Sequence, residues 1–462
     1  MNRIISTVVL NWLKLKKIFR FTPHDTTNAE GKSHERYRRI LLTGGSTAIV
    51  KVFSAVINLI TVPLTVNYLG AERYGLWMAI SSVLALMSFA DLGLGNGLLN
   101  AVSKANGRNN IEEAQTAVSS TFFILLGISL ILLLLFIAVF PFISWKSVFN
   151  VKSALAIKES GPTMMALVVI LLINMPLGIV ERIQSGYQEG YRFQLWLILG
   201  SILSLAGLLI CIFFKGGLTW LVIAYSGGQL IATLLNGVYL LSFRRRYLKP
   251  KFNYFKWDTG KLLIKSGFTF LLLGLFTLFA NASDDIIIAH TLSPSSVAGY
   301  EIVKKLFFFS MFTQYIIQPL WPAFSEALIS GDLNWARKTM QKALKLSIVS
   351  GAIITLPFLL FGKQIVTIWV GKEFIPSWSL LFGFYFYVIL NNYIGVMSTL
   401  LNSSKLVRRL IVPMALTAIV CIALKFILSL SIGISGIIWA SVIGWSIFFA
   451  IPSYSLSKSI FR

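Results

Sequence analysis

The chain alternates between long apolar stretches and short polar connections over most of its length. A transmembrane helix needs about 20 mostly apolar residues, and windows of this kind recur from residue 40 onward. The pattern predicts an all-α integral membrane protein with twelve transmembrane helices, at residues 40–69, 74–98, 116–143, 162–183, 193–214, 217–241, 262–290, 297–322, 338–361, 376–401, 408–430 and 433–453.

Composition supports this class and excludes several others. Hydrophobic residues make up 56% of the 462 residues and charged residues 13%, whereas soluble domains carry about 25% charged residues. The two cysteines lie in apolar runs and the three histidines are scattered, so we expect no metal site and no disulfide framework. No phosphate-binding glycine loop occurs, and the external loops are too short for a catalytic domain. We therefore expect a protein that is not an enzyme and has no cofactor.

The basic residues predict the orientation in the membrane. The net charge is +24. If the N-terminus is cytoplasmic, 30 of the 41 Lys and Arg residues fall in cytoplasmic connections, 7 in external ones and four inside spans. This asymmetry is the positive-inside pattern, so we expect both termini in the cytoplasm. Topology and attraction to anionic phospholipids account for the charge without a nucleic-acid partner. The most basic loop, Arg244–Trp257, is interpreted as a topology determinant in preference to a ligand site.

The two halves of the chain resemble each other at a fixed offset of 224 residues. This offset pairs identical residues at five positions: Gly75 with Gly299, Gly107 with Gly331, Asn110 with Asn334, Gly127 with Gly351, and Trp145 with Trp369. It also pairs span one with span seven, so the repeats are parallel. We predict two six-helix lobes, 40–243 and 262–455, around a central cavity. A cytoplasmic linker, 244–261, joins them, with a basic segment at 1–39 and a tail at 456–462.

Polar residues within the predicted spans indicate a lined cavity. In span one they recur every three or four residues, which places them on one helix face: Thr43, Thr47, Lys51, Ser54, Asn58, Thr61 and Thr65. Lys51 lies about 16 Å into this span. The intramembrane charges are four lysines and four acids: Lys51, Lys304, Lys305 and Lys425, with Asp91, Asp284, Asp285 and Glu301. Either they neutralise one another, or the lysines face an anionic substrate while the acids carry protons or bind a cation.

Several motifs together carry a family resemblance: LGAERYGLW (69–77), SFADLGLGNGL (88–98), ERIQSGYQEGYR (181–192), ASDDIIIAHTLSPSSVAGYEIVKKL (282–306) and QPLWPAFSEALISGDLNWA (318–336). With these motifs the chain resembles the Wzx-type O-antigen repeat-unit flippases of the multidrug/oligosaccharidyl-lipid/polysaccharide exporter superfamily. The resemblance implies a bacterial inner-membrane transporter that moves undecaprenyl-diphosphate-linked oligosaccharide to the periplasmic leaflet by alternating access, with proton or sodium coupling. Partners in polysaccharide assembly are also expected.

The resemblance assigns roles to particular residues. The family's cationic lumen corresponds to Lys51, Lys304 or Lys305, and Lys425, where a diphosphate has charge partners. Polar lining is expected from Thr47, Ser54, Asn58 and Asn281, and gating or ion coupling from Asp91, Asp284, Asp285, Glu301 and Glu326. The alternatives are a multidrug exporter of the same superfamily, which a cationic cavity disfavours, and a polytopic polymerase or ligase, which would carry a large periplasmic loop.

Asp91 raises a separate question because three glycines follow it, at 93, 95 and 97. It lies 17 residues from Tyr74 and so near the cytoplasmic end of span two. Glycines let backbones approach closely or let a helix end bend. We therefore expect an inner gate here, in which Asp91 holds the cytoplasmic side closed or takes a proton.

Overall fold

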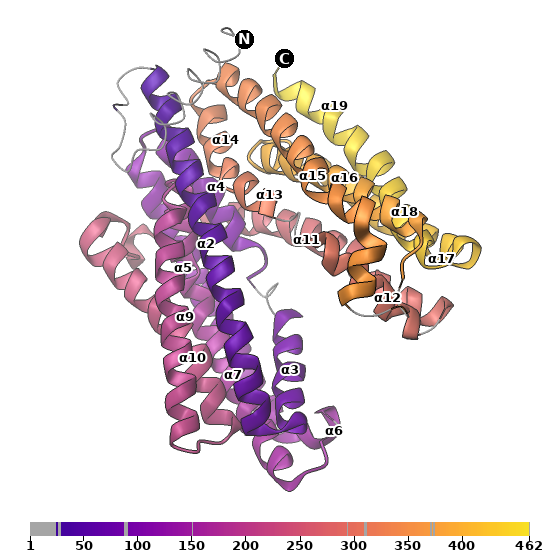
Figure 1. The fold of residues 1–462 in the computed structure, drawn as a ribbon. Helices are drawn as coiled ribbons and strands as arrows, with labels where there is room; N and C mark the ends of the chain where they lie inside the picture. The colour runs from indigo at the N-terminus through magenta and orange to yellow at the C-terminus, as the bar shows by residue number, and fades with distance from the viewer. Residues whose placement is uncertain are drawn as a thin grey trace, which may run out of the picture. The chain divides into compact units, whose positions relative to one another are not determined.

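The described chain is helical and divides into two units (Figure 1). The computed structural model describes residues 25, 29–86, 91–149, 151–292, 294–308, 312–369, 372 and 375–461, so the predicted basic segment 1–39 is described only in part. Gly45–Phe268 form one unit, here called the N-unit. The described residues up to Gly44 and from Thr269 onward form the other, the C-unit.

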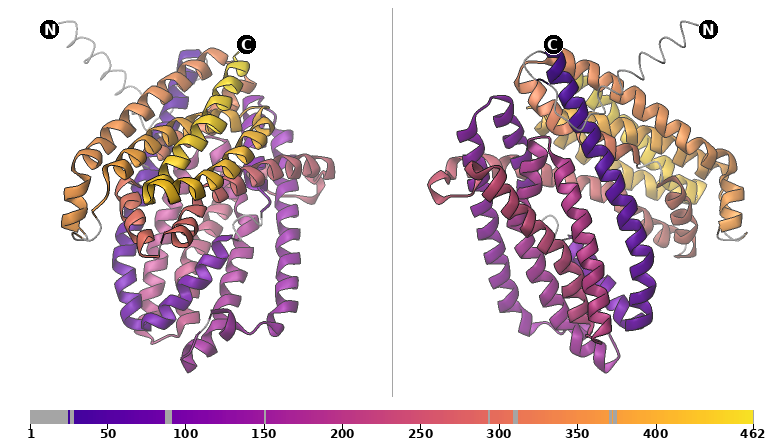
Figure 2. Two further views of the ribbon diagram at one scale, coloured as in Figure 1. Left: turned by 90° about the vertical axis from the view of Figure 1, so that its right-hand side faces the viewer. Right: turned by 60° about the vertical axis from the view of Figure 1, so that its left-hand side comes forward.

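The N-unit is built from antiparallel helices that pack on one another, with α9 and α10 side by side in Figures 1 and 2. Helix α2 (Ala29–Leu69) enters it from the C-unit. The other elements are α3 (Ala71–Leu86), α4 (Leu94–Gly107), α5 (Ile111–Val139), η2 (Phe140–Phe142), α6 (Trp145–Phe149), α7 (Ala154–Leu177), α8 (Ile179–Gly186), α9 (Gly190–Phe213), α10 (Leu218–Val238), η3 (Tyr239–Arg244), η4 (Arg246–Leu248) and η5 (Phe252–Tyr254).

The C-unit contains the later helices, of which α15 and α16 pack together and α17 packs on α18. Helix α11 (Trp257–Thr291) begins in the N-unit and ends in the C-unit. It is followed by α12 (Pro294–Phe308), α13 (Phe312–Ile317), α14 (Leu320–Ile329), α15 (Leu333–Trp369), α16 (Trp378–Asn402), η8 (Val407–Leu410), α17 (Ile411–Ile432), α18 (Ile434–Trp445), η9 (Ser446–Ala450) and α19 (Ile451–Ile460).

Ten of the described helical segments are long and apolar enough to cross a membrane. The all-α membrane fold predicted from the sequence is therefore confirmed. Each of the ten overlaps one expected span, and the two spans that remain are the second and the eighth. Both consist of shorter helices: α3 and α4 in the N-unit, and α12, α13 and α14 in the C-unit. The number of twelve crossings stays a prediction.

The turns that follow α4 and α14 have the same hydrogen-bond pattern. The backbone N–H of Asn110 donates to the carbonyl of Ala105, and that of Asp332 donates to Ala327, both at 2.9 Å. The side chains of Asn110 and Asp332 then each accept a backbone N–H three residues later, as N-caps do. These turns therefore correspond at an offset of 222, two residues less than the identities suggested, because Asp332 and not Asn334 occupies the capping position.

The connection between the predicted lobes packs on the N-unit. The amide of Gln115 donates to the carbonyl of Tyr247 at 2.9 Å. The hydroxyl of Ser120 accepts the backbone N–H of Lys256 at 3.1 Å. The predicted linker 244–261 is thus held against α5 by hydrogen bonds at Tyr247 and Lys256.

The first turns of α2 are fastened to the C-unit by Arg36. Its guanidinium donates to Glu326 of α14 at 3.1 Å and to Asp332 at 2.8 Å. Its guanidinium carbon lies 4.9 Å from the ring centroid of Trp335. Since the Arg36 side chain is only 6% exposed, the two carboxylates stabilise a charge that burial would otherwise disfavour.

Candidate functional site

An ion pair joins Lys425 of α17 to Asp284 of α11 inside the C-unit. The Nζ of Lys425 is 2.5 Å from Oδ1 of Asp284. The same ammonium also donates to the carbonyl of Ala280 and, at 3.2 Å, to the hydroxyl of Ser283. The Lys425 side chain is 0% exposed. A buried ammonium needs a charge partner and hydrogen-bond acceptors, and α11 supplies both.

Helix α12 brings three further polar groups to this pair. The Tyr300 hydroxyl donates to Oδ2 of Asp284 at 2.8 Å. One helical turn later, Lys304 pairs with Glu301 at 2.6 Å, and its Nζ is 5.7 Å from the Tyr300 ring centroid. Asp284 is therefore held by both a cation and a hydroxyl donor.

Asp285 adds a third carboxyl to the same region. It interacts electrostatically with Lys304, Glu301 and Asp284. Its Oδ1 is buried and accepts no hydrogen bond from the described residues. Three acids thus interact with two lysines, Lys304 and Lys425, so this region holds one more carboxyl than ammonium groups.

The cluster borders a cavity of about 220 Å³ within the C-unit. Asn281 of α11 lines it and accepts a hydrogen bond from the Tyr387 hydroxyl of α16 at 3.2 Å. The remaining lining residues include Asp284, Tyr300, Lys304, Asn391, Asn392 and Ser441. Protein pockets that bind small molecules have volumes of about 300–1,000 Å³. This cavity is smaller, so it has room for ions and water but not for an oligosaccharide.

The four lysines expected to form one cationic site have different environments. Lys425 and Lys304 form ion pairs inside the C-unit, and Lys425 is inaccessible to a ligand. Lys305 is exposed, although it follows Lys304 directly in sequence. Lys51 is also exposed but belongs to the N-unit.

The polar face of α2 is only partly accessible. Thr47, Thr61 and Thr65 are buried, whereas Ser54 is half-buried. The Thr65 hydroxyl donates to the carbonyl of Thr61 at 2.7 Å, so it is satisfied within its own helix. The side chain of Asn58 lies outside the described residues.

Asp91 organises the break between α3 and α4. Its carboxylate accepts the backbone N–H of Gly93 at 2.9 Å and that of Gly95 at 3.3 Å. Gly93 has φ 72°, a conformation that glycine adopts readily. A carboxylate at a helix start satisfies N–H groups that lack a partner within the helix. Glu326 differs because it lies near the last turn of α14, where Arg36 pairs with it.

Sequence reasoning missed the tyrosines of this site. Tyr300 and Tyr387 bind the side chains of Asp284 and Asn281, but neither tyrosine is among the site residues predicted from the sequence. The signal available for Tyr300 was its position one turn before Lys304 on a helix that carries three charged residues. Nothing comparable marks Tyr387.

Comparison with known proteins shows related sequences and folds. A polysaccharide biosynthesis protein family matches residues 42–328. A Salmonella typhimurium protein named "Putative O-antigen transporter" is 24% identical, over 91% of this chain and 97% of its own length. A Yersinia pseudotuberculosis protein named "Putative O-antigen export protein" is 23% identical, over 84% and 89%.

Solved structures with the same fold include MATE transporters. One, a multidrug resistance MATE family transporter in an outward-facing conformation, matches with a TM-score of 0.77 at 16% identity, covering 92% of this chain and 96% of that one. The crystal structure of MATE in the straight conformation gives 0.73 at 16% identity over the same shares. At these identities the likeness shows the fold alone.

These matches confirm the resemblance that the motifs predicted. The family covers more than half of the chain, and the many apolar helices make this a multi-pass membrane protein. The chain belongs to the polysaccharide biosynthesis protein family.

Proposed function

We propose that this protein flips an undecaprenyl-diphosphate-linked oligosaccharide, an O-antigen or similar surface-polysaccharide repeat unit, from the cytoplasmic to the periplasmic leaflet. The family match and the names of the relatives support the substrate class, and the MATE-like fold supports transport. A diphosphate sugar cannot cross hydrocarbon unaided because its polar groups would lose their hydrogen bonds to water. The positive-inside charge pattern supports cytoplasmic termini.

The observation that carries this proposal is the Asp284–Lys425 cluster. Buried charge inside a membrane-spanning unit is costly and generally functional. The adjoining cavity of about 220 Å³ is too small for the sugar but suits a proton or sodium ion. We therefore assign Asp284, Asp285 and Glu301 to ion coupling, with Lys425 and Lys304 as internal counter-ions.

The exposed lysines are the better partners for the anionic head group. Lys51 and Lys305 are accessible, whereas Lys425 is enclosed. A lysine that contacts a diphosphate contributes a charge-assisted interaction. In this proposal the head group contacts an exposed lysine, Lys51 of the N-unit or Lys305 of the C-unit, and the C-unit cluster changes its protonation or cation occupancy during the cycle.

Complementation of a deletion strain tests the flippase assignment. A cell that lacks this protein and any second flippase should accumulate lipid-linked repeat units on the cytoplasmic face and lose surface polysaccharide. Restoration by wild type but not by Lys51→Ala/Lys305→Ala is expected, while Lys249→Ala/Lys251→Ala, which removes two exposed loop charges, should restore export. Normal surface polysaccharide in the deletion strain contradicts the assignment.

Ion coupling is tested in proteoliposomes loaded with lipid-linked substrate. Flipping should depend on a proton or a sodium gradient, and Asp284→Asn should abolish that dependence. Equal flipping rates with and without both gradients would refute the coupling role while leaving the flippase assignment intact.

A further inference from the structure

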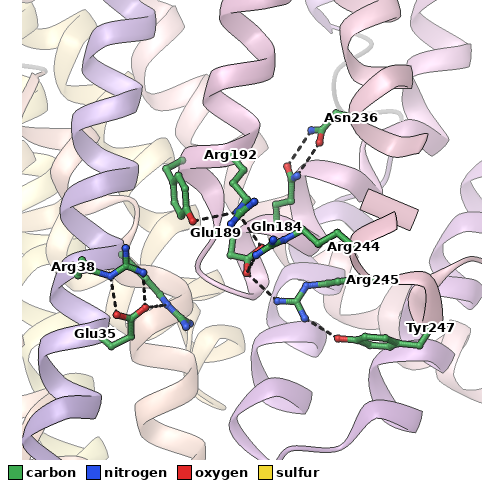
Figure 3. A network of polar contacts seen from close by, with 11 residues as sticks. Glu35, Arg38, Gln184, Glu189, Arg192, Asn236, Arg244, Arg245 and Tyr247 are labelled. Atoms are coloured by element: carbon green, nitrogen blue, oxygen red, sulfur yellow. Dashed lines mark hydrogen bonds and ion pairs between the residues drawn. The ribbon is translucent and has the colours of Figure 1, made fainter. Parts of the chain in front are cut away.

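Three arginines surround one carboxylate in the N-unit (Figure 3). Glu189 lies in the turn between α8 and α9. Arg244 donates to both of its oxygens, at 3.0 and 3.2 Å, and Arg245 donates to Oε1 at 3.1 Å. The Nε of Arg192 is 3.7 Å from Oε2. We name these four residues the arginine cluster; its formal charge is +2 when Glu189 is ionised.

Glu189 remains ionised at neutral pH. Burial acts to raise its pKa, but the hydrogen bond from Arg244 and the charges of Arg245, Arg244 and Arg192 outweigh burial, so the pKa lies below its ordinary value. The carboxylate therefore holds the guanidinium groups together without neutralising them. An anion that binds the three guanidinium groups competes only with the single negative charge of Glu189.

The surroundings fix the positions of these arginines. The guanidinium carbon of Arg245 lies 3.6 Å from the ring centroid of Tyr187, and its Nη1 donates to the Tyr247 hydroxyl at 2.7 Å. Beside the cluster, Gln184 of α8 and Asn236 of α10 exchange hydrogen bonds at 2.8 and 3.1 Å. Because the groups are held before a ligand arrives, binding costs little side-chain entropy.

Donor capacity remains on the cluster. An arginine has five N–H donors. Among the described residues, Nη1 of Arg244 has no hydrogen-bond acceptor. The three side chains remain 19–31% exposed. The site can therefore accept an oxyanion such as a phosphate, which guanidinium groups recognise through paired hydrogen bonds.

The apolar surface next to the cluster indicates where such a phosphate comes from. Tyr239 and Phe243, just before Arg244, are 42% and 67% exposed, and Tyr239 contacts Trp196 of α9 at 6.2 Å between ring centroids. Exposed aromatics at helix ends are typical of the membrane interface. Leu195 of α9 and Val238 of α10 are also exposed, at 58% and 55%, and provide an apolar surface for acyl chains.

We propose that the arginine cluster binds the phosphate of an anionic phospholipid at the membrane surface, with the acyl chains against α9 and α10. The site belongs to the N-unit and requires no assumption about the transported substrate. Its consequence is that bound anionic lipid stabilises this end of the N-unit. Basic groups between transmembrane helices are a known way to hold anionic headgroups.

Native mass spectrometry of the detergent-purified full chain tests this site. Phosphatidylglycerol should bind more tightly than phosphatidylcholine, and Arg244→Gln/Arg245→Gln should weaken phosphatidylglycerol binding about thirtyfold, since each cation near an anionic headgroup contributes about a factor of five. The matched control is Lys249→Gln/Lys251→Gln, which removes two exposed charges from the same loop. This control should lose less than about a factor of five.

Equal losses in the two double variants would overturn the proposal, because they would indicate diffuse attraction to the loop. Glu189→Gln keeps all three arginines and a hydrogen-bond acceptor, so it should bind phosphatidylglycerol at least as tightly as wild type; weaker binding would also overturn it. Glycerol phosphate at the same concentration should not displace the lipid. Full displacement would mean that the site takes free phosphate rather than a lipid.

Discussion

The second and eighth predicted spans occupy corresponding places in the two units but use their charges differently. Both are broken into short helices, and the turns that follow α4 and α14 share backbone hydrogen bonds and an N-cap. In the N-unit, the charge at the break is Asp91, whose carboxylate binds backbone N–H groups of Gly93 and Gly95. In the C-unit, the charges of α12 bind other ionisable side chains around a cavity.

Asp91 therefore has a structural role at a helix start, whereas the acids of the C-unit interact with other charged side chains. The carboxylate of Asp91 satisfies the start of a helix, a role that a neutral acceptor can also fill. Asp284 instead balances a buried ammonium, so its charge cannot be removed without leaving Lys425 unpaired. Loss of the Asp284 charge is therefore the costlier change, since it leaves a buried ammonium without its counter-ion. The C-unit is therefore the better candidate for ion coupling.

The largest expected effect comes from separating the buried ion pair. Lys425→Met leaves Asp284 charged and unpaired and should lower the free energy of unfolding by about 3–5 kcal/mol. Thermal unfolding in detergent measures this. The double variant Lys425→Met/Asp284→Asn should recover much of the loss while transport stays uncoupled. Additive losses in the double variant would show that the two residues do not act as a pair.

The helix breaks of spans two and eight should also differ in how well they tolerate a methyl group added at a glycine that packs against them. At Gly267, a Cβ would lie 2.8 Å from the Leu92 carbonyl oxygen and 2.9 Å from backbone atoms of the same turn. At Gly395, the three nearest atoms all belong to the flexible side chain of Gln314. We expect Gly267→Ala to cost about 1–3 kcal/mol and Gly395→Ala clearly less, as measured by thermal unfolding. The reverse order would mean that the α3–α4 break adapts more easily than its contacts indicate.

Substitution of Asp91 distinguishes a helix cap from a coupling residue. Asp91→Ala should lower stability by about 1 kcal/mol, because the N–H groups of Gly93 and Gly95 lose their acceptor. Asp91→Asn retains an acceptor and should keep both stability and gradient-driven transport. If transport by Asp91→Asn no longer depended on an ion gradient, as we expect for Asp284→Asn, Asp91 would also be a coupling residue. The proposed difference between the two units would then be wrong.

A smaller effect is expected from pH on the paired acid of the N-unit. The pKa of Glu189 is below its ordinary value of 4.5, so its stabilising contribution is present above pH 4.5 and is lost as the pH falls through the lowered value. Glu189→Gln should flatten this part of the unfolding profile. An unchanged acid limb in that variant would assign the pH dependence to another carboxyl.

The sequence predicted which charged residues belong to the site. Intramembrane charge is rare enough that Lys304, Glu301, Asp284 and Lys425 stood out from their apolar neighbours. The sequence could not predict which of them form ion pairs. Lys304 binds Glu301 within one helix, whereas Lys425 binds Asp284 on another helix far away in the chain. Lys305 shows the same limit: it differs from Lys304 only by one step of helix rotation, which turns it toward the exposed surface.

The sequence by itself determined the membrane class, the helices and the family, because apolar length and local motifs are properties of contiguous residues. Tertiary structure alone decided where spans two and eight break, that residues 244–261 pack on the N-unit, and that Glu189 gathers Arg192, Arg244 and Arg245. Each of these depends on contacts between distant segments. In a mostly apolar interior, a charged group adopts the position where a partner offsets its lost hydration, and only the folded chain supplies that partner.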